Sequence, residues 1–162
     1  MKNNFSKIPE CKDESSLTDQ FLSFVEIVKI LREKCPWDNR QTNESIAALI
    51  VEEAYEVLDA IHKKEDKEFA KELGDLFLHI VMHSVMADER SAFNLIDVLK
   101  LIKQKLIHRH PHVFGNTSVN GETEVLQNWE SLKLKEGRTS MLQGVPKSLP
   151  SLLRAQRLQH KA

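Results

Sequence analysis

The chain has 162 residues, of which 41% are hydrophobic, and this is enough for one domain with a single core. Its 23 basic and 24 acidic side chains leave a formal net charge of −1, which argues against nucleic-acid binding through bulk positive charge. Five glycines and five prolines are too few for a collagen-like or turn-rich all-β chain, and two cysteines are too few for a disulfide scaffold. The first sixteen residues lack the apolar segment of a signal peptide, and no apolar run approaches the ~20 residues of a membrane span. We therefore expect a cytoplasmic protein with neither a nucleic acid nor a membrane as its partner.

Apolar residues recur at three- and four-residue steps along most of the chain, which is typical of helices. We expect helices over residues 17–35, 43–63, 68–89, 93–108 and 124–136, and the start of another after residue 150. Thr42 is the expected N-cap of the second helix, and Pro111 ends the fourth. No segment shows the two-residue alternation of half-buried strands, so the predicted fold class is all-α, an antiparallel helical bundle.

The expected organisation has three parts. Residues 1–16 are a flexible leader, and residues 17–136 form the helical domain. Residues 137–162 combine a linker with the beginning of a helix, as in a chain that leads on to a second domain.

Five acidic side chains on the second and third helices are the most informative feature. At 3.6 residues per turn, Glu53 and Glu56 lie about 60° apart around the helix, and Glu52 and Glu56 about 40° apart. Glu72 and Asp75 are one turn apart on the next helix. A short connection makes the two helices antiparallel neighbours, so the carboxylates can meet.

These acids occupy positions that the periodicity assigns to the inward face. Glu53 and Glu56 share a stripe with apolar residues of the second helix, and Glu72 shares one with apolar residues of the third. Uncompensated burial of several carboxylates would cost several kcal/mol for each charge. A hard divalent cation such as Mg²⁺, with Mn²⁺ as a substitute, resolves this conflict because it prefers oxygen ligands.

Two other interpretations compete with a magnesium site. In the first, the acids lie on a solvated face and pair with the lysines nearby, which are Lys63, Lys64, Lys67 and Lys71. In the second, the helices form a di-iron bundle, but such a bundle needs Glu-x-x-His pairs and none occurs.

The acidic residues and three further blocks together resemble the MazG nucleoside triphosphate pyrophosphohydrolases of the all-α NTP pyrophosphohydrolase superfamily. The superfamily motif stands here as Glu-Glu-x-x-Glu at residues 52–56 and Glu-x-x-Asp at residues 72–75. The MazG features are CPWD at residues 35–38 with Gln41 and Thr42, RHPHVFG at residues 109–115, and NWE at residues 128–130.

The resemblance implies an enzyme that hydrolyses nucleoside triphosphates to the monophosphate and pyrophosphate with Mg²⁺, in nucleotide-pool housekeeping. It also implies a homodimer or a dimer of dimers. By motif position the metal ligands are Glu53, Glu56, Glu72 and Asp75. Glu52 is then an accessory ligand or orients the attacking water, so that Glu52 and Glu53 form the catalytic pair.

Basic and aromatic residues supply candidate contacts for the rest of a nucleotide. Lys105 and Arg109 suit phosphate oxygens, although solvated side chains at a helix C-terminus would look the same. Trp37 and Trp129 are candidates for stacking on a base, with core packing as the alternative. His79 lies on an apolar stripe and is expected to be a satisfied core histidine.

Two other functions remain open from the sequence. A narrower substrate such as dUTP or phosphoribosyl-ATP would keep the same acidic motif. A non-catalytic helical domain that binds metal or nucleotide for assembly would also keep it.

Overall fold

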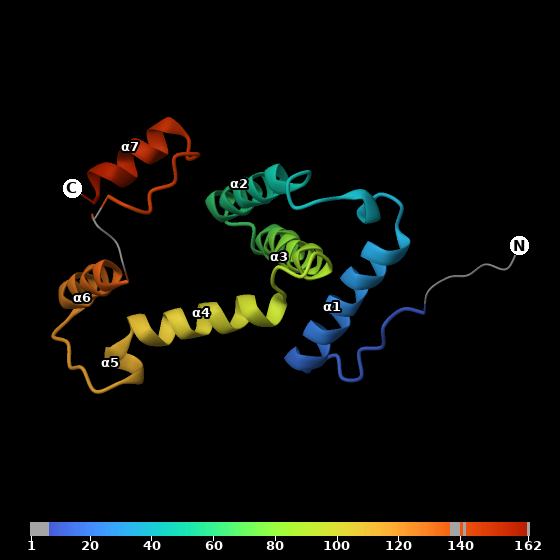
Figure 1. The fold of residues 1–162 in the computed structure, drawn as a ribbon, viewed down its shortest axis with the longest axis horizontal. Helices are drawn as coiled ribbons and strands as arrows, with labels where there is room; N and C mark the ends of the chain where they lie inside the picture. Colours follow the sequence, from blue (N-terminus) through green and yellow to red (C-terminus); the bar gives the residue numbers. More distant parts are fainter. Residues whose placement is uncertain (1–6, 137–139, 141, 162) are drawn as a thin grey trace, which may run out of the picture. The chain divides into compact units, whose positions relative to one another are not determined.

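The computed structural model describes residues 7–136, 140 and 142–161, and its ordered elements in this part of the chain are all helical (Figure 1). The elements are α1 (Leu17–Lys34), the 3₁₀ turn η1 (Asp38–Arg40), α2 (Ala47–Lys63), α3 (Asp66–Glu89), α4 (Leu95–Arg109), α5 (Pro111–Phe114), α6 (Glu122–Lys135) and α7 (Ser151–Gln159). The all-α class predicted from the sequence is confirmed. Residues 1–6 of the expected leader and residues 137–139, 141 and 162 of the expected linker and final helix lie outside the described residues.

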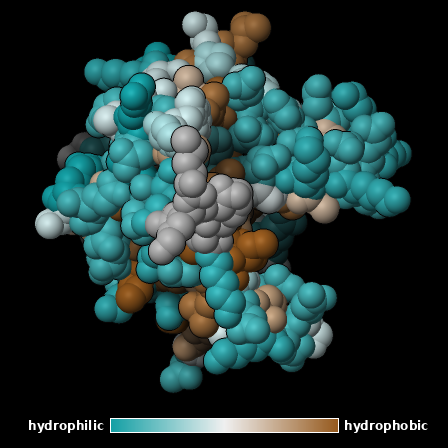
Figure 2. Space-filling model, turned by 90° about the vertical axis from the view of Figure 1, so that its right-hand side faces the viewer, coloured by the Kyte–Doolittle hydropathy of each residue, from teal (hydrophilic) through white to brown (hydrophobic). Residues whose placement is uncertain are grey.

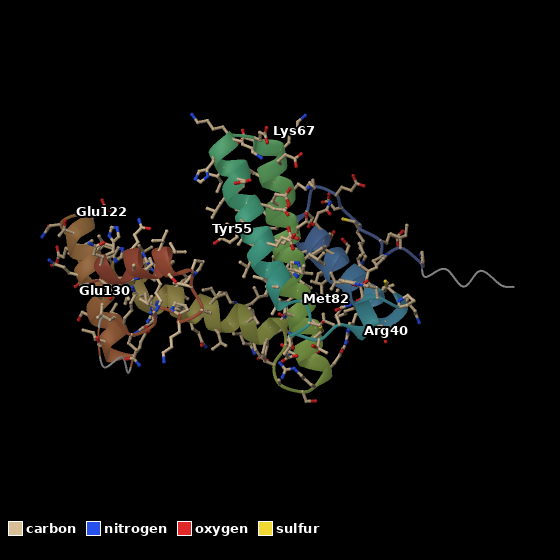
Figure 3. The ribbon with its side chains drawn as sticks, turned by 90° about the horizontal axis from the view of Figure 1, so that it is seen from above. Arg40, Tyr55, Lys67, Met82, Glu122 and Glu130 are labelled. Atoms are coloured by element: carbon tan, nitrogen blue, oxygen red, sulfur yellow. The ribbon has the colours of Figure 1, made fainter. Side chains whose placement is uncertain are left out.

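The chain forms two compact units, residues 1–99 and residues 100–162, which are described separately. In the first unit, α2 and α3 lie side by side as an antiparallel hairpin, and α1 and η1 complete the unit (Figures 1 and 3). The connection between α2 and α3 is as short as expected, because Lys64 turns the chain with a left-handed φ of 58°. The backbone N–H groups of Lys64 and Glu65 donate to the carbonyls of Ile61 and Ala60, which satisfies the end of α2.

The core of the first unit lies where α1 packs on α3 beside the start of α2. Its buried members come from all three segments and are Val28, Ile46, Val81, Met82 and Met86. Met82 is labelled on α3 in Figure 3. Phe24 of α1 stacks on Phe77 of α3 with ring centroids 5.5 Å apart. At the C-terminal ends of the same two helices, the guanidinium of Arg32 donates to both carboxylate oxygens of Glu89, at 2.8 and 2.9 Å.

Four helix starts differ from the sequence prediction: α3 and α6 begin two residues earlier than expected, and α2 and α4 begin later. Thr42 does not cap α2, because its hydroxyl accepts from the backbone N–H of Ser45 and closes a separate turn before the helix begins at Ala47. The fourth helix begins at Leu95 rather than residue 93. The side chain of Asn94 accepts from the N–H groups of Ile96 and Asp97, and Asp97 accepts from the N–H of Asn94. These reciprocal bonds satisfy the first turn of α4.

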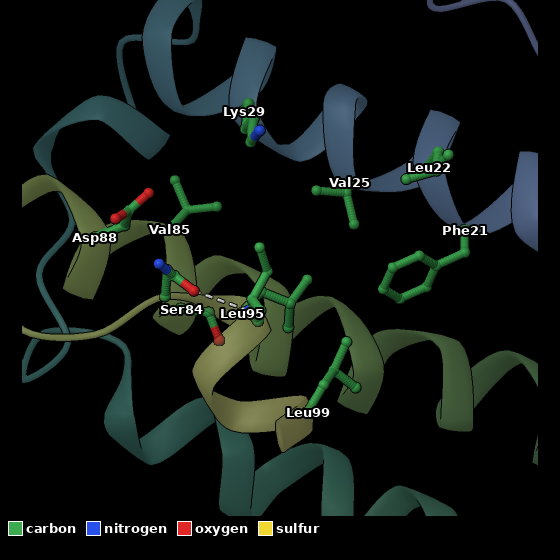
Figure 4. Close-up of a pocket in the computed structure, with 11 residues that line it drawn as sticks. Phe21, Leu22, Val25, Lys29, Ser84, Val85, Asp88, Leu95 and Leu99 are labelled. Atoms are coloured by element: carbon green, nitrogen blue, oxygen red, sulfur yellow. Dashed lines mark hydrogen bonds between the residues drawn. The ribbon is translucent and has the colours of Figure 1, made fainter. Parts of the chain in front are cut away.

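An apolar groove of about 300 Å³ lies between α1, α3 and the first turn of α4 (Figure 4). Phe21 and Val25 of α1 face Val85 of α3 and Leu95 and Leu99 of α4 across it. Its lining is mostly apolar and has Asp88 as its one acidic member, so the groove is chemically unlike the acidic site described below.

In the second unit, residues predicted as a loop after Pro111 contain the short helix α5. Proline suits the first position of a helix, since its fixed φ is helical and its missing N–H would have no partner there. The chain then folds back tightly, because a Cβ on Gly115 would lie 2.9 Å from the carbonyl oxygen of Pro111. Arg109 pairs with Glu136 through Nε and through its terminal nitrogen.

The surface carries many large apolar side chains. On the face seen in Figure 2, hydrophobic residues lie in patches among hydrophilic ones. On α2, Val51, Tyr55 and Leu58 are about half exposed and lie within one stripe, and Tyr55 projects on the side away from α3 (Figure 3). Among the described helices, none has both the length and the apolar character needed to cross a membrane.

Candidate metal centre

Three carboxylates meet between α2 and α3. Each of Glu53, Glu56 and Glu72 offers one oxygen, and these three oxygens all lie within 4.8 Å of one another. Glu53 and Glu56 are one turn apart on α2, and Glu72 faces them from α3. The hairpin therefore brings together three of the four metal ligands that the sequence predicted.

Glu72 is the buried member of this cluster. Its relative exposure is 5%, whereas Glu53 is half-buried and Glu56 is exposed. Its Oε1 accepts from the ammonium of Lys71 at 2.8 Å, but its Oε2 is buried and has no hydrogen-bond partner among the described residues. An ionised carboxylate oxygen in this position is costly unless a cation or a donor satisfies it.

The carboxylates of the cluster repel one another in the absence of a cation. The pKa of Glu56 is raised above its usual value by partial desolvation of the carboxylate and then by the negative charges of Glu72 and Glu53. The pKa of Lys71 is raised, chiefly by its hydrogen bond to Glu72. A set of only oxygen donors with one orphaned buried oxygen fits a hard divalent cation.

An open pocket of about 430 Å³ lies beside the cluster. Glu56 and Glu72 form part of its lining, together with Asp59, Lys63 and Glu68. The side chains of Asp59 and Lys63 form a loose ion pair at 3.9 Å. Because most of its lining is acidic, an anionic ligand would enter this pocket only with cations that balance the charge.

The match to a family of known proteins falls on this part of the chain. Residues 41–114, which include all three clustered glutamates, match the MazG nucleotide pyrophosphohydrolase domain. This segment of the chain is thus similar to a MazG domain.

Curated relatives resemble this segment and its flanks. A nucleoside triphosphate pyrophosphohydrolase of Escherichia coli K12 is 40% identical over 88% of this chain, which covers 56% of that protein. The nucleoside triphosphate pyrophosphohydrolase/pyrophosphatase MazG of Thermotoga maritima is 38% identical over 88% of this chain, again covering 56% of that protein. The uncharacterized protein YabN of Bacillus subtilis is 41% identical over 94% of this chain but is covered to only 32%. The chain thus spans about half or less of the length of these relatives.

A solved structure supports the fold. The crystal structure of a mazG-related protein from Thermotoga maritima superimposes with a TM-score of 0.60, covering 68% of this chain and 96% of that one. At 23% sequence identity, this likeness shows that the helical architecture is shared.

The remaining acids of the MazG motif lie outside the cluster. Asp75 follows Glu72 by one turn and is half-buried, but its oxygens are not among the three that converge. Glu52 precedes Glu53 on α2 and is exposed. The roles of Asp75 as a ligand and of Glu52 toward water therefore stay predictions.

The predicted nucleotide contacts are found in different surroundings. Trp37, at the start of η1, is 58% exposed. In the second unit, Lys105 is exposed, whereas the pKa of Arg109 is raised by its hydrogen bond to Glu136. Trp129 has His110 edge-on at 5.6 Å and the ammonium of Lys133 at 4.7 Å from its ring centroid. Arg109 and Trp129 thus already have partners within the second unit.

Sequence reasoning named His79 but did not anticipate that it lies next to Glu53. His79, expected to be a satisfied core residue, is buried, but its Nδ1 has no hydrogen-bond partner among the described residues. Its Nε2 lies 3.9 Å from Oε1 of Glu53. The available signal was the seven-residue step from Glu72 to His79, which places both side chains on the side of α3 that meets α2.

Proposed function

We propose that this protein is a magnesium-dependent nucleoside triphosphate pyrophosphohydrolase that releases the nucleoside monophosphate and pyrophosphate. The observation that carries this proposal is the convergence of Glu53, Glu56 and Glu72, with a buried unpaired oxygen, inside a segment that is similar to a MazG domain. The names of the curated relatives agree with this activity. Nucleotide-pool housekeeping in the cytoplasm is the role that such an activity would serve.

The proposed ligands of the magnesium are Glu53, Glu56, Glu72 and Asp75. When bound, the cation would offset the charge of the phosphates and lower the pKa of a coordinated water. Glu72 provides the most fixed oxygen, because it is buried and held through its second oxygen by Lys71. We assign to Glu52, which is next to Glu53 and exposed, the role of orienting the attacking water or accepting its proton.

We assign the remaining phosphate contacts and the base of the nucleotide to basic and aromatic residues. Lys105 and Arg109 would bind phosphate oxygens, and for Arg109 the phosphate would share or displace Glu136. Trp37 and Trp129 would stack on the base, an interaction that tolerates many bases because each has a π-face.

We also propose a homodimer, or a dimer of dimers. The stripe of Val51, Tyr55 and Leu58 on α2 has a counterpart on α3, where Leu73, Phe77 and Ile80 are more than one-third exposed. Apolar stripes on neighbouring helices are typical of surfaces that another subunit covers. We keep the domain division that the sequence predicts, in which residues 17–136 form the catalytic domain and a linker follows it.

The decisive experiment is an assay with defined products. The protein is incubated with Mg²⁺ and a panel of nucleoside triphosphates that includes dUTP and phosphoribosyl-ATP, in ¹⁸O-labelled water. We expect monophosphate and pyrophosphate, with the label on the monophosphate because water attacks the α-phosphorus. Diphosphate and phosphate as products would contradict the proposed bond. Tight metal binding without any product would favour a non-catalytic domain that binds metal or nucleotide. Turnover of one nucleotide alone, such as dUTP or phosphoribosyl-ATP, would favour an enzyme with a narrower substrate range.

A further inference from the structure

His79 lies next to Glu53, one of the three clustered glutamates, and is largely buried. It follows Glu72 by two helical turns on α3, so both side chains project toward α2. Its Nε2 is 3.9 Å from Oε1 of Glu53, and the two side chains are 11% and 20% exposed. This separation is longer than a hydrogen bond but within the range of a direct electrostatic contact.

The next histidine along α3 has a defined hydrogen-bonding state. The side-chain oxygen of Asn43 accepts from Arg90, so its NH₂ group donates to Nδ1 of His83 at 2.8 Å and to the His83 carbonyl at 3.0 Å. His83 is therefore an acceptor at Nδ1, and its proton is on Nε2. Burial, followed by the neighbouring His79, lowers the pKa of His83, which agrees with a neutral ring.

This arrangement also indicates which nitrogen of His79 carries its proton. The ring of His83 is 6.2 Å away, and Nε2 of His83 is a buried donor without a partner among the described residues. On His79 the buried atom without a partner is Nδ1. The carboxylate of Glu53 can only accept and lies 3.9 Å from Nε2, so this contact favours a proton on Nε2 of His79. His79 thus presents its N–H from Nε2 to Glu53.

We propose that His79 is a positioning residue that fixes the carboxylate of Glu53 in the metal cluster. The inference rests on the proposed function only in that Glu53 is a metal ligand. Partners behind metal ligands hold them in orientation, and their loss typically costs about 10- to 100-fold in metal affinity. No nitrogen of His79 belongs to the group of three converging atoms, which are all glutamate oxygens, so its assigned role is to act through Glu53.

Four variants test this role by direct binding of Mn²⁺, measured by calorimetry or electron paramagnetic resonance without nucleotide. His79→Leu removes the donor and His79→Asn shortens it, so both are expected to weaken binding about 10- to 100-fold. His79→Gln keeps an amide N–H near the position of Nε2 and is expected to bind within about threefold of the wild type. His62→Leu, at an exposed histidine of α2, is the matched control and should bind as the wild type does.

Thermal melting without metal separates positioning from folding. His79→Asn and His79→Gln have the same polar group, so a merely structural role would affect both alike, whereas positioning distinguishes their Mn²⁺ affinities. Wild-type affinity in His79→Leu and His79→Asn, or equal weakening in His79→Gln and His79→Asn, would overturn the proposal. Failure of the proposed function would look different: the wild-type protein would release no pyrophosphate, while the order of Mn²⁺ affinities among these variants would be unchanged.

Discussion

Lys71 and Glu72 are neighbours in sequence, and the ammonium of Lys71 lies 2.8 Å from Oε1 of the one buried glutamate in the cluster. The side chain of Lys71 is 61% exposed and that of Glu72 is 7% exposed. The lysine therefore approaches from solvent, and the other oxygen of Glu72 is left for the site between α2 and α3. This contact supplies part of the positive charge that the cluster lacks.

Replacement of this lysine should alter metal binding and metal-free stability in opposite directions. In Lys71→Met the cluster is more negative, so we expect Mg²⁺ affinity to rise about two- to fivefold, the range of an exposed ion pair. The metal-free protein should melt at a lower temperature, because repulsion among the glutamates is less compensated. Calorimetry and thermal melting measure the two effects. Lys67→Met, at an exposed lysine of the same helix (Figure 3), should change neither.

The raised pKa of Glu56 predicts a pH dependence of metal-free stability. The folded state holds this proton more tightly than the unfolded chain, so the contribution is fully present below the ordinary pKa of 4.5. It is lost as the pH rises through the raised value. Glu56→Gln removes this loss, so its melting temperature should exceed that of the wild type by a margin that grows as the pH rises above 4.5.

Saturating Mg²⁺ is the control for that measurement. Only the wild type keeps all its carboxylate ligands, so the metal should stabilise it more than Glu56→Gln and reverse the order of melting temperatures. An unchanged order in Mg²⁺ would show that Glu56 is not a ligand.

Two variants test the proposed metal ligands. Glu53→Gln changes a glutamate inside the three-carboxylate cluster, and Asp75→Asn changes an acid outside it. Loss of a metal ligand removes several kcal/mol of transition-state stabilisation, so pyrophosphate release should fall at least about 100-fold in each. Circular dichroism should show unchanged helix content. Glu26→Gln, at an exposed acid on α1, is the matched control. Wild-type turnover in Asp75→Asn would remove Asp75 from the ligand set and leave the three glutamates.

The two tryptophans are the only ones in the chain, so single-tryptophan variants can assign their roles. We expect an ATP analogue with a methylene bridge between the α- and β-phosphates to change the fluorescence of Trp37, which is largely exposed. The change should be observed in Trp129→Phe, where Trp37 remains. Trp129→Leu should lower stability by about 1–2 kcal/mol, because it removes the contacts with His110 and Lys133. A response confined to Trp129 would exclude base stacking by Trp37.

Self-association should depend on the apolar stripe of α2. Leu58→Glu places a charge between Val51 and Ile61, both exposed, and is expected to shift a dimer to monomer at micromolar concentration. Light scattering after size exclusion measures the mass. Leu152→Glu changes an even more exposed leucine of α7 and should leave the mass unaltered. A monomeric wild-type protein at all concentrations would contradict the proposed dimer.

The sequence by itself determined the helical class and the α2–α3 hairpin, and it placed five acids on these two helices. Periodicity shows which residues share a face, and a short connection leaves two helices few ways to pack. The positions of Glu53, Glu56 and Glu72 could be read in this way because all three follow from helix geometry. The start of α2 could not, since Thr42 and Ser45 form a local turn whose hydrogen bonds compete with the cap.

Only the tertiary structure decided which acids converge and what lies behind them. Glu72 and Asp75 are both acidic and one turn apart, but only Glu72 has an oxygen that converges with those of Glu53 and Glu56. The same packing places His79 against Glu53, a contact between side chains 26 positions apart in the chain. Periodicity predicts which face of a helix a side chain lies on. The distance from that side chain to one on the neighbouring helix depends on how the two helices pack, and the sequence pattern of a single helix does not determine this packing.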